Sequence, residues 1–383
     1  IKYSDKLRDL DISNTKIEDI SELVNLTNLQ VFKASNTAIQ SFAVLNQFKN
    51  LKYLDLTESG FNSIENIKDL AVLETLSLSN NYILNYSLLS KLSSLVTLDL
   101  SETNFEDLSP LSSMSKLVHL DITACNISDL SPVASLKSLE KIAADETKVS
   151  QEDATLFVRN HPDILLIHHV KDLQSWWESL SLAWKSVLIK INPELQIEKP
   201  KIEVLTQTLN LSELNLDDSG IETLIPLVRF VALTSISVSN NQKIDNLLPL
   251  QEVKTLRQFT AKNTSVQDGS GLKENVLLER IDLEGSPILS IAALFSLPKL
   301  RYLNVNSSEV KEIEFPEFLL SRPDVLIIYR SDSLGSWWEG LDEDWKQVWS
   351  EKYKLSASPT TEELHHLTSA SSLALERVSF TSL

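Results

Sequence analysis

The feature that most constrains this chain is a repeat of 22 residues in its N-terminal half. Seven similar segments begin at Leu7, Leu29, Leu51, Leu73, Leu95, Leu117 and Leu139. When each repeat is numbered from its leucine, apolar residues recur at positions 1, 4, 6, 11, 14, 17 and 20. A unit this short cannot bury its own apolar row, so neighbouring units must stack on one another. The spacing therefore predicts an elongated solenoid.

The pattern within one repeat predicts a short strand followed by a tight turn. Positions 4 and 6 flank a residue that points the other way, as in a β-strand. The later apolar residues are three apart, which fits a 3₁₀ or short helical turn better than an α-helix. A second array starts at Leu211, Leu233, Leu256, Leu278 and Leu300, and its one extra residue lies in the loop 240–243. Loops tolerate such insertions where strands do not.

This pattern resembles the leucine-rich repeat, in the 22-residue class of bacterial internalin-like proteins and of intracellular regulators with the same period. The resemblance implies an α/β solenoid of two horseshoe arrays. Each array would have a parallel sheet on its concave face, 3₁₀ or short helical turns on its convex face, and a Trp-rich helical cap at its end. In its tandem modules, each with a WW…W segment, the chain is similar to bacterial leucine-rich repeat proteins of the Bacteroidetes type. The resemblance implies no enzymatic activity.

A longer duplication predicts that array, terminal strand and Trp-rich segment form one module that occurs twice. Residues 161–167 match residues 322–328 at an offset of 161, and so do the two Ser-Trp-Trp-Glu segments. Pro200, Glu203 and Leu205 have the spacing of Pro359, Glu362 and Leu364. The predicted divisions are array A at 1–170, a helical cap and linker at 171–200, array B at 201–330, a second cap at 331–358, and the start of a truncated third module at 359–383, with its opening strand at 375–380. Because the chain begins at Ile1 with neither an initiator Met nor a signal peptide, we expect a piece of a longer tandem protein.

All seven tryptophans lie in the two segments after the arrays. Helical spacing from Leu173 to Leu188 makes one broad apolar stripe. Because the last repeat of a solenoid leaves an apolar end to be covered, we expect Trp176 and Trp337 to be largely buried against the last strand of their own arrays. The alternative is an aromatic platform for a sugar or a protein partner.

Motifs for chemistry are missing, and the prediction is a protein without catalytic residues, cofactor or metal. The sequence has no G-x-S-x-G, Walker or G-x-G-x-x-G motif. His168 and His169 should point to opposite faces of a strand, and His365 and His366 should diverge on a helix. The single cysteine, Cys125, stands at position 9, a column expected to turn inward and satisfy backbone groups.

The charge balance bears on the partner. A formal charge of −18 disfavours nucleic acids and anionic membranes, which are polyanions. No apolar stretch approaches the roughly 18 residues of a membrane span, so we also expect no membrane insertion.

The concave face is the candidate binding surface, because side chains alternate along a strand and positions 2, 3, 5 and 7 would point into it. Asp99 and Asp121 should stand on neighbouring strands about 4.8 Å apart, a like-charge contact that favours a basic partner. Array B offers arginine and tyrosine, which are enriched at interface hot spots. The candidate ligand-binding residues are Tyr53, Asp55, Asp99, His119, Asp121, Lys141, Arg257, Arg280, Arg301 and Tyr302. The alternative is that these are ordinary solvated side chains.

Together these features favour non-enzymatic protein–protein recognition by rigid, preorganised concave faces. The preferred setting is a bacterial surface or secreted binding and adhesion protein. The alternative is an intracellular leucine-rich repeat scaffold that regulates a partner enzyme. Another protein is the expected partner, with a carbohydrate as the minor alternative.

Overall fold

The computed structural model describes residues 4, 6–196 and 198–368, which divide into two compact units. Unit 1 runs to Ser179 and adds Glu198–Thr208, whereas unit 2 takes Leu180–Ile197 and the described chain from Leu209 onward. The strand predicted at 375–380 lies outside the described residues.

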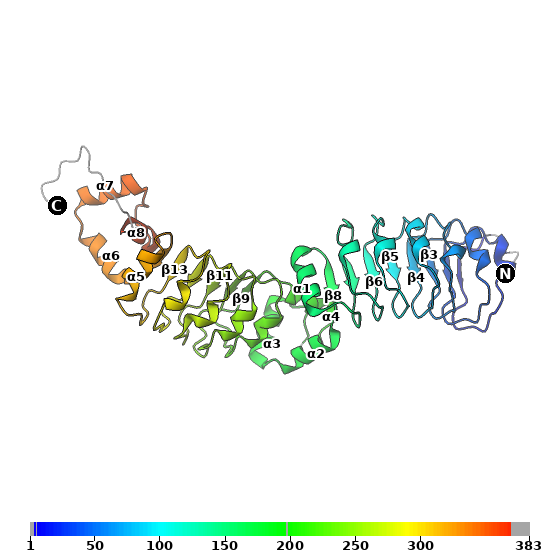
Figure 1. Cartoon of the computed structure of the whole chain (residues 1–383), viewed down its shortest axis with the longest axis horizontal. Helices are drawn as coiled ribbons and strands as arrows, with labels where there is room; N and C mark the ends of the chain where they lie inside the picture. Colours follow the sequence, from blue (N-terminus) through cyan, green and yellow to red (C-terminus); the bar gives the residue numbers. More distant parts are fainter. Residues whose placement is uncertain (1–3, 5, 197, 369–383) are drawn as a thin grey trace. The chain divides into compact units, whose positions relative to one another are not determined.

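Array A forms one parallel sheet whose strands follow each other in chain order (Figure 1). Its strands are β1 (Asp9–Asp11), β2 (Val31–Lys33), β3 (Tyr53–Asp55), β4 (Thr75–Ser77), β5 (Thr97–Asp99), β6 (His119–Asp121), β7 (Lys141–Ala143) and β8 (Leu165–Ile167). The returning turns are the 3₁₀ helices η1 (Ser21–Asn25), η2 (Ala43–Gln47), η3 (Ile64–Asn66), η4 (Ser87–Lys91), η5 (Ser109–Leu111) and η6 (Ser131–Val133). The register follows the repeat, so that Leu98 stands beside Leu120. The predicted solenoid with 3₁₀ turns is confirmed.

Array B repeats the arrangement with six parallel strands. They are β9 (Glu213–Asn215), β10 (Ser235–Ser237), β11 (Gln258–Thr260), β12 (Arg280–Asp282), β13 (Tyr302–Asn304) and β14 (Leu326–Ile328). The turns between them are η7 (Ile225–Arg229), η8 (Leu248–Glu252), η9 (Gly269–Leu272) and η10 (Ala292–Leu294). The extra residue near Asn241 is accommodated between strands, and the register passes from Ile236 to Phe259 without interruption.

Helices occur where the repeat pattern ends. They are α1 (Gln151–Asn160), α2 (Val170–Ser179), α3 (Leu182–Ile191), α4 (Ile202–Leu209), α5 (Glu314–Ser321), α6 (Ser331–Gly340), α7 (Glu343–Tyr353) and α8 (Thr361–Thr368). Helices α1 and α5 precede the last strand of each array, at the place of a 3₁₀ turn. Ser181 caps α3 and Asp342 caps α7. Each side chain accepts the backbone N–H of the tryptophan three residues further on, which satisfies a donor at the helix start.

The inward column at position 9 holds neighbouring repeats together. Thr103 Oγ1 donates to its own repeat's Leu100 carbonyl at 2.6 Å. Asn81 donates to the Leu56 carbonyl of the preceding repeat at 2.8 Å and accepts the Phe61 N–H. These bonds satisfy backbone groups that no water reaches. The expected role of this column is confirmed.

Cys125 in this column is 3% exposed, and its Sγ donates to the Leu100 carbonyl at 3.0 Å. Burial raises the pKa of the thiol, which further lowers its thiolate fraction. We expect a maleimide to label native Cys125 about a hundredfold more slowly than the unfolded chain, because labelling must await local opening. Labelling kinetics with and without urea test this. Equally rapid labelling in both states would mean that the thiol is accessible.

The predicted cap differs from the observed one. Trp177 and Trp184 are each 1% exposed, whereas Trp176 is only partly buried and Trp337 is 39% exposed. The expectation was therefore wrong for Trp337, whereas Trp176 lies between buried and exposed. Trp184 lies in unit 2, where its indole N–H donates to the Thr223 carbonyl of array B at 3.0 Å. A solenoid has two open ends, and α3 covers the beginning of the array that follows it.

Candidate functional site

The concave face of array A presents the side chains at positions 3 and 5 of each repeat. Asp99 and Asp121 are register partners on β5 and β6, and so are His119 and Lys141 on β6 and β7. These four residues line one shallow hollow of about 270 Å³. Tyr53 and Asp55 lie on β3, two strands away on the same sheet. The structure thus brings four of the six array A candidates together. We call these four residues the acidic hollow.

The aspartates at position 5 also have a structural role that sequence reasoning missed. Each accepts the backbone N–H two residues further on, at 2.9–3.0 Å, in the pairs Asp11–Ser13, Asp55–Thr57, Asp99–Ser101 and Asp121–Thr123. Such bonds end the strand in an Asx turn. Backbone and side-chain hydrogen bonds from Ser13 lower the pKa of Asp11, so this carboxylate is held ionised. The motif Asp-x-Ser/Thr was the available signal.

The charge of the acidic hollow follows from what its members contact. Lys141 forms an ion pair with Glu203 of α4 at 3.0 Å, so its charge is already paired within unit 1. Asp99 accepts from the Ser77 hydroxyl at 2.8 Å. Within residues 6–196 and 198–368, neither Asp99 nor Asp121 forms an ion pair. The hollow therefore presents two adjacent carboxylates to solvent.

Array B differs because its candidate cations are neutralised within unit 2. Arg257 pairs with Glu279 at 2.7 Å, and Arg301 pairs with Asp324 at 2.6 Å. Both arginines stand at position 2, beside the strands. Neither presents a free charge on the face itself.

Arg280 and Tyr302 lie near the start of α8. The Arg280 guanidinium carbon is 3.3 Å from the centre of the Tyr302 ring, a cation–π contact, and Glu362 of α8 lies 3.7 Å from Arg280. Tyr302 is only 9% exposed and forms a buried cluster with Leu326 and Ile328. Burial raises the pKa of Tyr302. Because α8 packs against β14, the candidate Tyr302 belongs to a closed part of the sheet, whereas the paired side chain of Arg280 stays 40% exposed.

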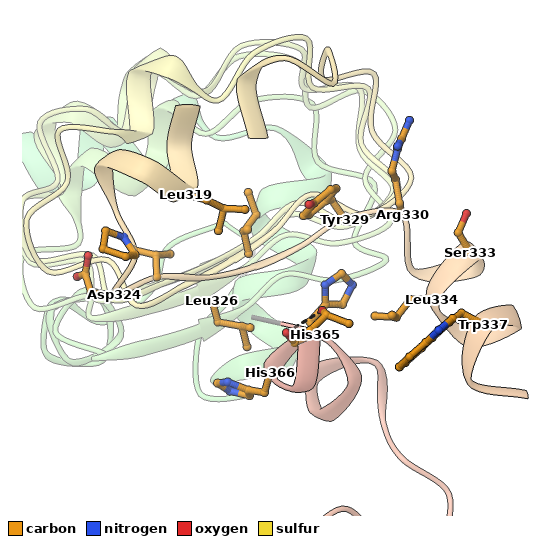
Figure 2. A pocket seen from close by; sticks show the side chains of 14 residues that line it. Leu319, Asp324, Leu326, Tyr329, Arg330, Ser333, Leu334, Trp337, His365 and His366 are labelled. Atoms are coloured by element: carbon orange, nitrogen blue, oxygen red, sulfur yellow. Dashed lines mark hydrogen bonds between the residues drawn. The ribbon is translucent and has the colours of Figure 1, made fainter. Parts of the chain in front are cut away.

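A groove of about 740 Å³ lies between β14, α6 and α8 (Figure 2). Tyr329 stacks on Phe315 at 4.1 Å between ring centres, and His365 follows at 5.9 Å from Tyr329. The Ser331 hydroxyl lies 3.3 Å from His365 Nε2. Figure 2 shows Trp337 and Leu334 on the α6 side of this groove. Sequence reasoning did not predict this groove, because it forms only when α8 folds back onto β14.

Burial lowers the pKa of His365 from 6.5 to about 4, so this imidazole is neutral at pH 7 in the folded protein. In the unfolded chain it binds a proton below pH 6.5, and the folded state does not until about pH 4. Stability is therefore expected to fall as the pH drops through this window. His365→Thr, which installs the residue found at the matching place in α4, should remove this part of the loss.

Urea unfolding of the parent protein and of His365→Thr, each at about pH 7 and about pH 5, measures how much stability each loses on acidification. His366→Thr is the matched control, because His366 is exposed and its neighbour is not. An unchanged pH dependence in His365→Thr would contradict the assignment.

The adjacent histidines of array A do not diverge as expected. Strand β8 ends at Ile167, and His169 adopts a left-handed conformation with φ of 51°, which turns the chain toward α2. The ring Nδ1 atoms of His168 and His169 come within 2.6 Å as a result. Both histidines lie beyond the end of the strand, so the alternation of side chains along a strand does not apply to them. In the described part of the chain, no three His, Cys, Asp or Glu side chains cluster as metal ligands would.

Comparison with known proteins supports the repeat assignment. A family model described as "Leucine Rich repeats (2 copies)" matches residues 27–72 and 93–135, both within array A. These residues are leucine-rich repeats, and each of the two sheets keeps the arrangement of one parallel strand per repeat. Proteins of this kind are generally recognition modules that bind other proteins, and they are typically non-enzymatic. No curated protein sequence matches the chain significantly.

Several solved structures are similar in fold. An internalin, InlF, from Listeria monocytogenes is 18% identical, with 84% of this chain and 80% of that chain covered and a TM-score of 0.39. A leucine-rich repeat protein of Leptospira interrogans is 16% identical, with 84% and 95% covered and a TM-score of 0.33. A complex of TLR13 with ssRNA13 is 16% identical, with 84% and 47% covered and a TM-score of 0.39.

Proposed function

We propose that the chain is a non-enzymatic recognition protein and that the acidic hollow of array A binds a basic surface of a protein partner. The observation that supports this most is the pair Asp99 and Asp121, which are adjacent and form no ion pair within the described residues. A partner's lysine or arginine would relieve their repulsion. The candidate arginines of array B, in contrast, all have internal carboxylate partners.

The proposed setting is a bacterial surface or secreted protein that binds or adheres to its partner. The alternative is an intracellular scaffold that docks a partner enzyme. A polyanion would be repelled by the hollow, so nucleic acid is not the proposed ligand, even though TLR13 is solved with an RNA. In the described part of the chain, no helix is long and apolar enough to cross a membrane. A carbohydrate remains the minor alternative to a protein partner.

The test begins with crosslinking and mass spectrometry on the intact chain to identify a partner, followed by binding kinetics. We expect the double variant Asp99→Asn and Asp121→Asn to slow association about tenfold at low ionic strength, with a smaller effect at high salt. Asparagine keeps an oxygen for the turn hydrogen bonds, so folding should be preserved.

The matched control is Asp107→Asn with Asp129→Asn. These aspartates stand in the same two repeats and accept N–H groups in the same way, from Ser109 and Ser131, but they precede the convex turns. Equal losses in both double variants would contradict the concave assignment. Partners confined to the cytosol would favour the scaffold alternative.

A further inference from the structure

Helices α3 and α7 occupy the same place in the two copies of the duplicated module. At the offset of 161 residues, four apolar positions of the α3 segment match apolar positions of the α7 segment: Leu180 with Leu341, Trp184 with Trp345, Val187 with Val348, and Leu188 with Trp349. Both helices begin with a side-chain cap that accepts the backbone N–H of the tryptophan. The two helices are therefore built to present the same face.

The two faces are buried to different extents. In the α3 segment, Leu180, Trp184, Val187 and Leu188 are 8%, 1%, 8% and 0% exposed. None of the residues of α7 is buried. The rings of Trp345 and Trp349 stack at 6.1 Å between centres, and Tyr353 follows at 5.6 Å, so the face is a continuous aromatic row. These α7 side chains are half-buried, whereas their counterparts in the α3 segment are buried, so the row on α7 leaves apolar surface that a further packing partner would cover.

The surface that buries α3 identifies what would bury α7. Helix α3 belongs to the same unit as array B, the array that follows it in sequence, and Trp184 donates to the carbonyl of Thr223 in the first repeat of that array. After α8, Leu375, Val378 and Phe380 have the spacing of Leu211, Leu214 and Leu216, which open array B. A leucine-rich array in the same position relative to α7 would offer the same apolar edge and the same carbonyl.

We propose that the face of α7 that carries Trp345 and Trp349 is the N-terminal cap of a third leucine-rich array, one that continues in the same polypeptide from residues 375–380. Each Trp-rich segment then joins two arrays: its first helix belongs to the module before it and its second helix to the array after it. The aromatic row on α7 is a docking surface for a repeat array.

The first test uses the chain as it exists. Because both helices belong to unit 2, hydrogen exchange compares them within one compact body. We expect the amides of α7 to exchange at least about tenfold faster than those of α3, because only α3 has its array in place. Equal protection of the two helices would overturn the proposal, since α7 would then need no further covering.

The second test supplies the missing array. Residues 211–330 replace residues 375–383, so that Leu211 takes the place of Leu375. We expect the exchange of α7 to slow about tenfold, to the rate of α3. Trp345→Lys with Trp349→Lys should abolish this protection, whereas Trp337→Lys on the neighbouring helix α6 should not. An unprotected α7, whether or not the added array folds, would overturn the proposal.

A second copy of the chain is the competing occupant. If α7 of the unextended chain becomes protected as the protein concentration rises, and sedimentation shows a dimer, the surface joins two copies and the third-array assignment is wrong. A monomer with rapid α7 exchange at every concentration is the expected result.

Discussion

Trp184→Ala is expected to lower the free energy of unfolding of unit 2 by about 3–5 kcal/mol, as large aromatic deletions in cores do. The indole is 1% exposed, so its removal leaves a cavity beside the first repeat of array B. It also removes the N–H that satisfies the Thr223 carbonyl at 3.0 Å. Array B would lose the cover of its N-terminal end, and unfolding should begin at β9.

Trp345→Ala is the matched control, because the same residue type stands at the same place in the second copy but is only partly buried. Its cost should be about 1 kcal/mol or less. Urea unfolding followed by circular dichroism gives the midpoints, and hydrogen exchange at β9 locates the loss. Equal midpoints for the two variants would contradict the assignment of α3 as the cap of array B.

The repeats could be predicted from the sequence because periodicity is local information. A spacing of 22 residues fixes the register of each parallel strand, and the alternation at positions 4 and 6 fixes which side chains face the core. The inward column could be predicted as well, since a small polar residue such as Thr103 recurs at position 9 of every array A repeat except that of Cys125. The same register predicted that Asp99 and Asp121 stand side by side on neighbouring strands.

The caps and the closed part of array B could not be predicted in the same way. The stripe on α3 shows that one face must be buried, but nothing in it says which of two neighbouring arrays buries it. Likewise, Arg280 and Tyr302 are residue types enriched at binding hot spots, yet their accessibility depends on α8. This helix follows Tyr302 by some 60 residues and Arg280 by some 80, and it folds back onto β14. Contacts between segments this far apart have no sequence period to reveal them.

Gly271→Ala should be the most disruptive small substitution in unit 2, at about 3 kcal/mol or more. Gly271 is buried in η9, where a Cβ would stand 2.3 Å from the backbone carbonyl carbon of Leu247 in the neighbouring repeat. Because the obstacle is backbone rather than the end of a flexible side chain, the two repeats would have to separate. Close stacking of successive turns thus requires glycine at this position.

Gly269→Ala isolates the effect, because Gly269 lies in the same 3₁₀ turn and is also buried, but its Cβ would meet only the Leu294 side chain at 3.5 Å. That is ordinary van der Waals contact, and the added methyl reduces the entropy of the unfolded chain, so this variant should lie within about 1 kcal/mol of the parent. Urea midpoints of unit 2 and hydrogen exchange at β11 and β12 compare the pair. Similar stability of the two variants would mean that neighbouring repeats can separate at little cost, and that the stacking of array B is looser than the contact between η8 and η9 implies.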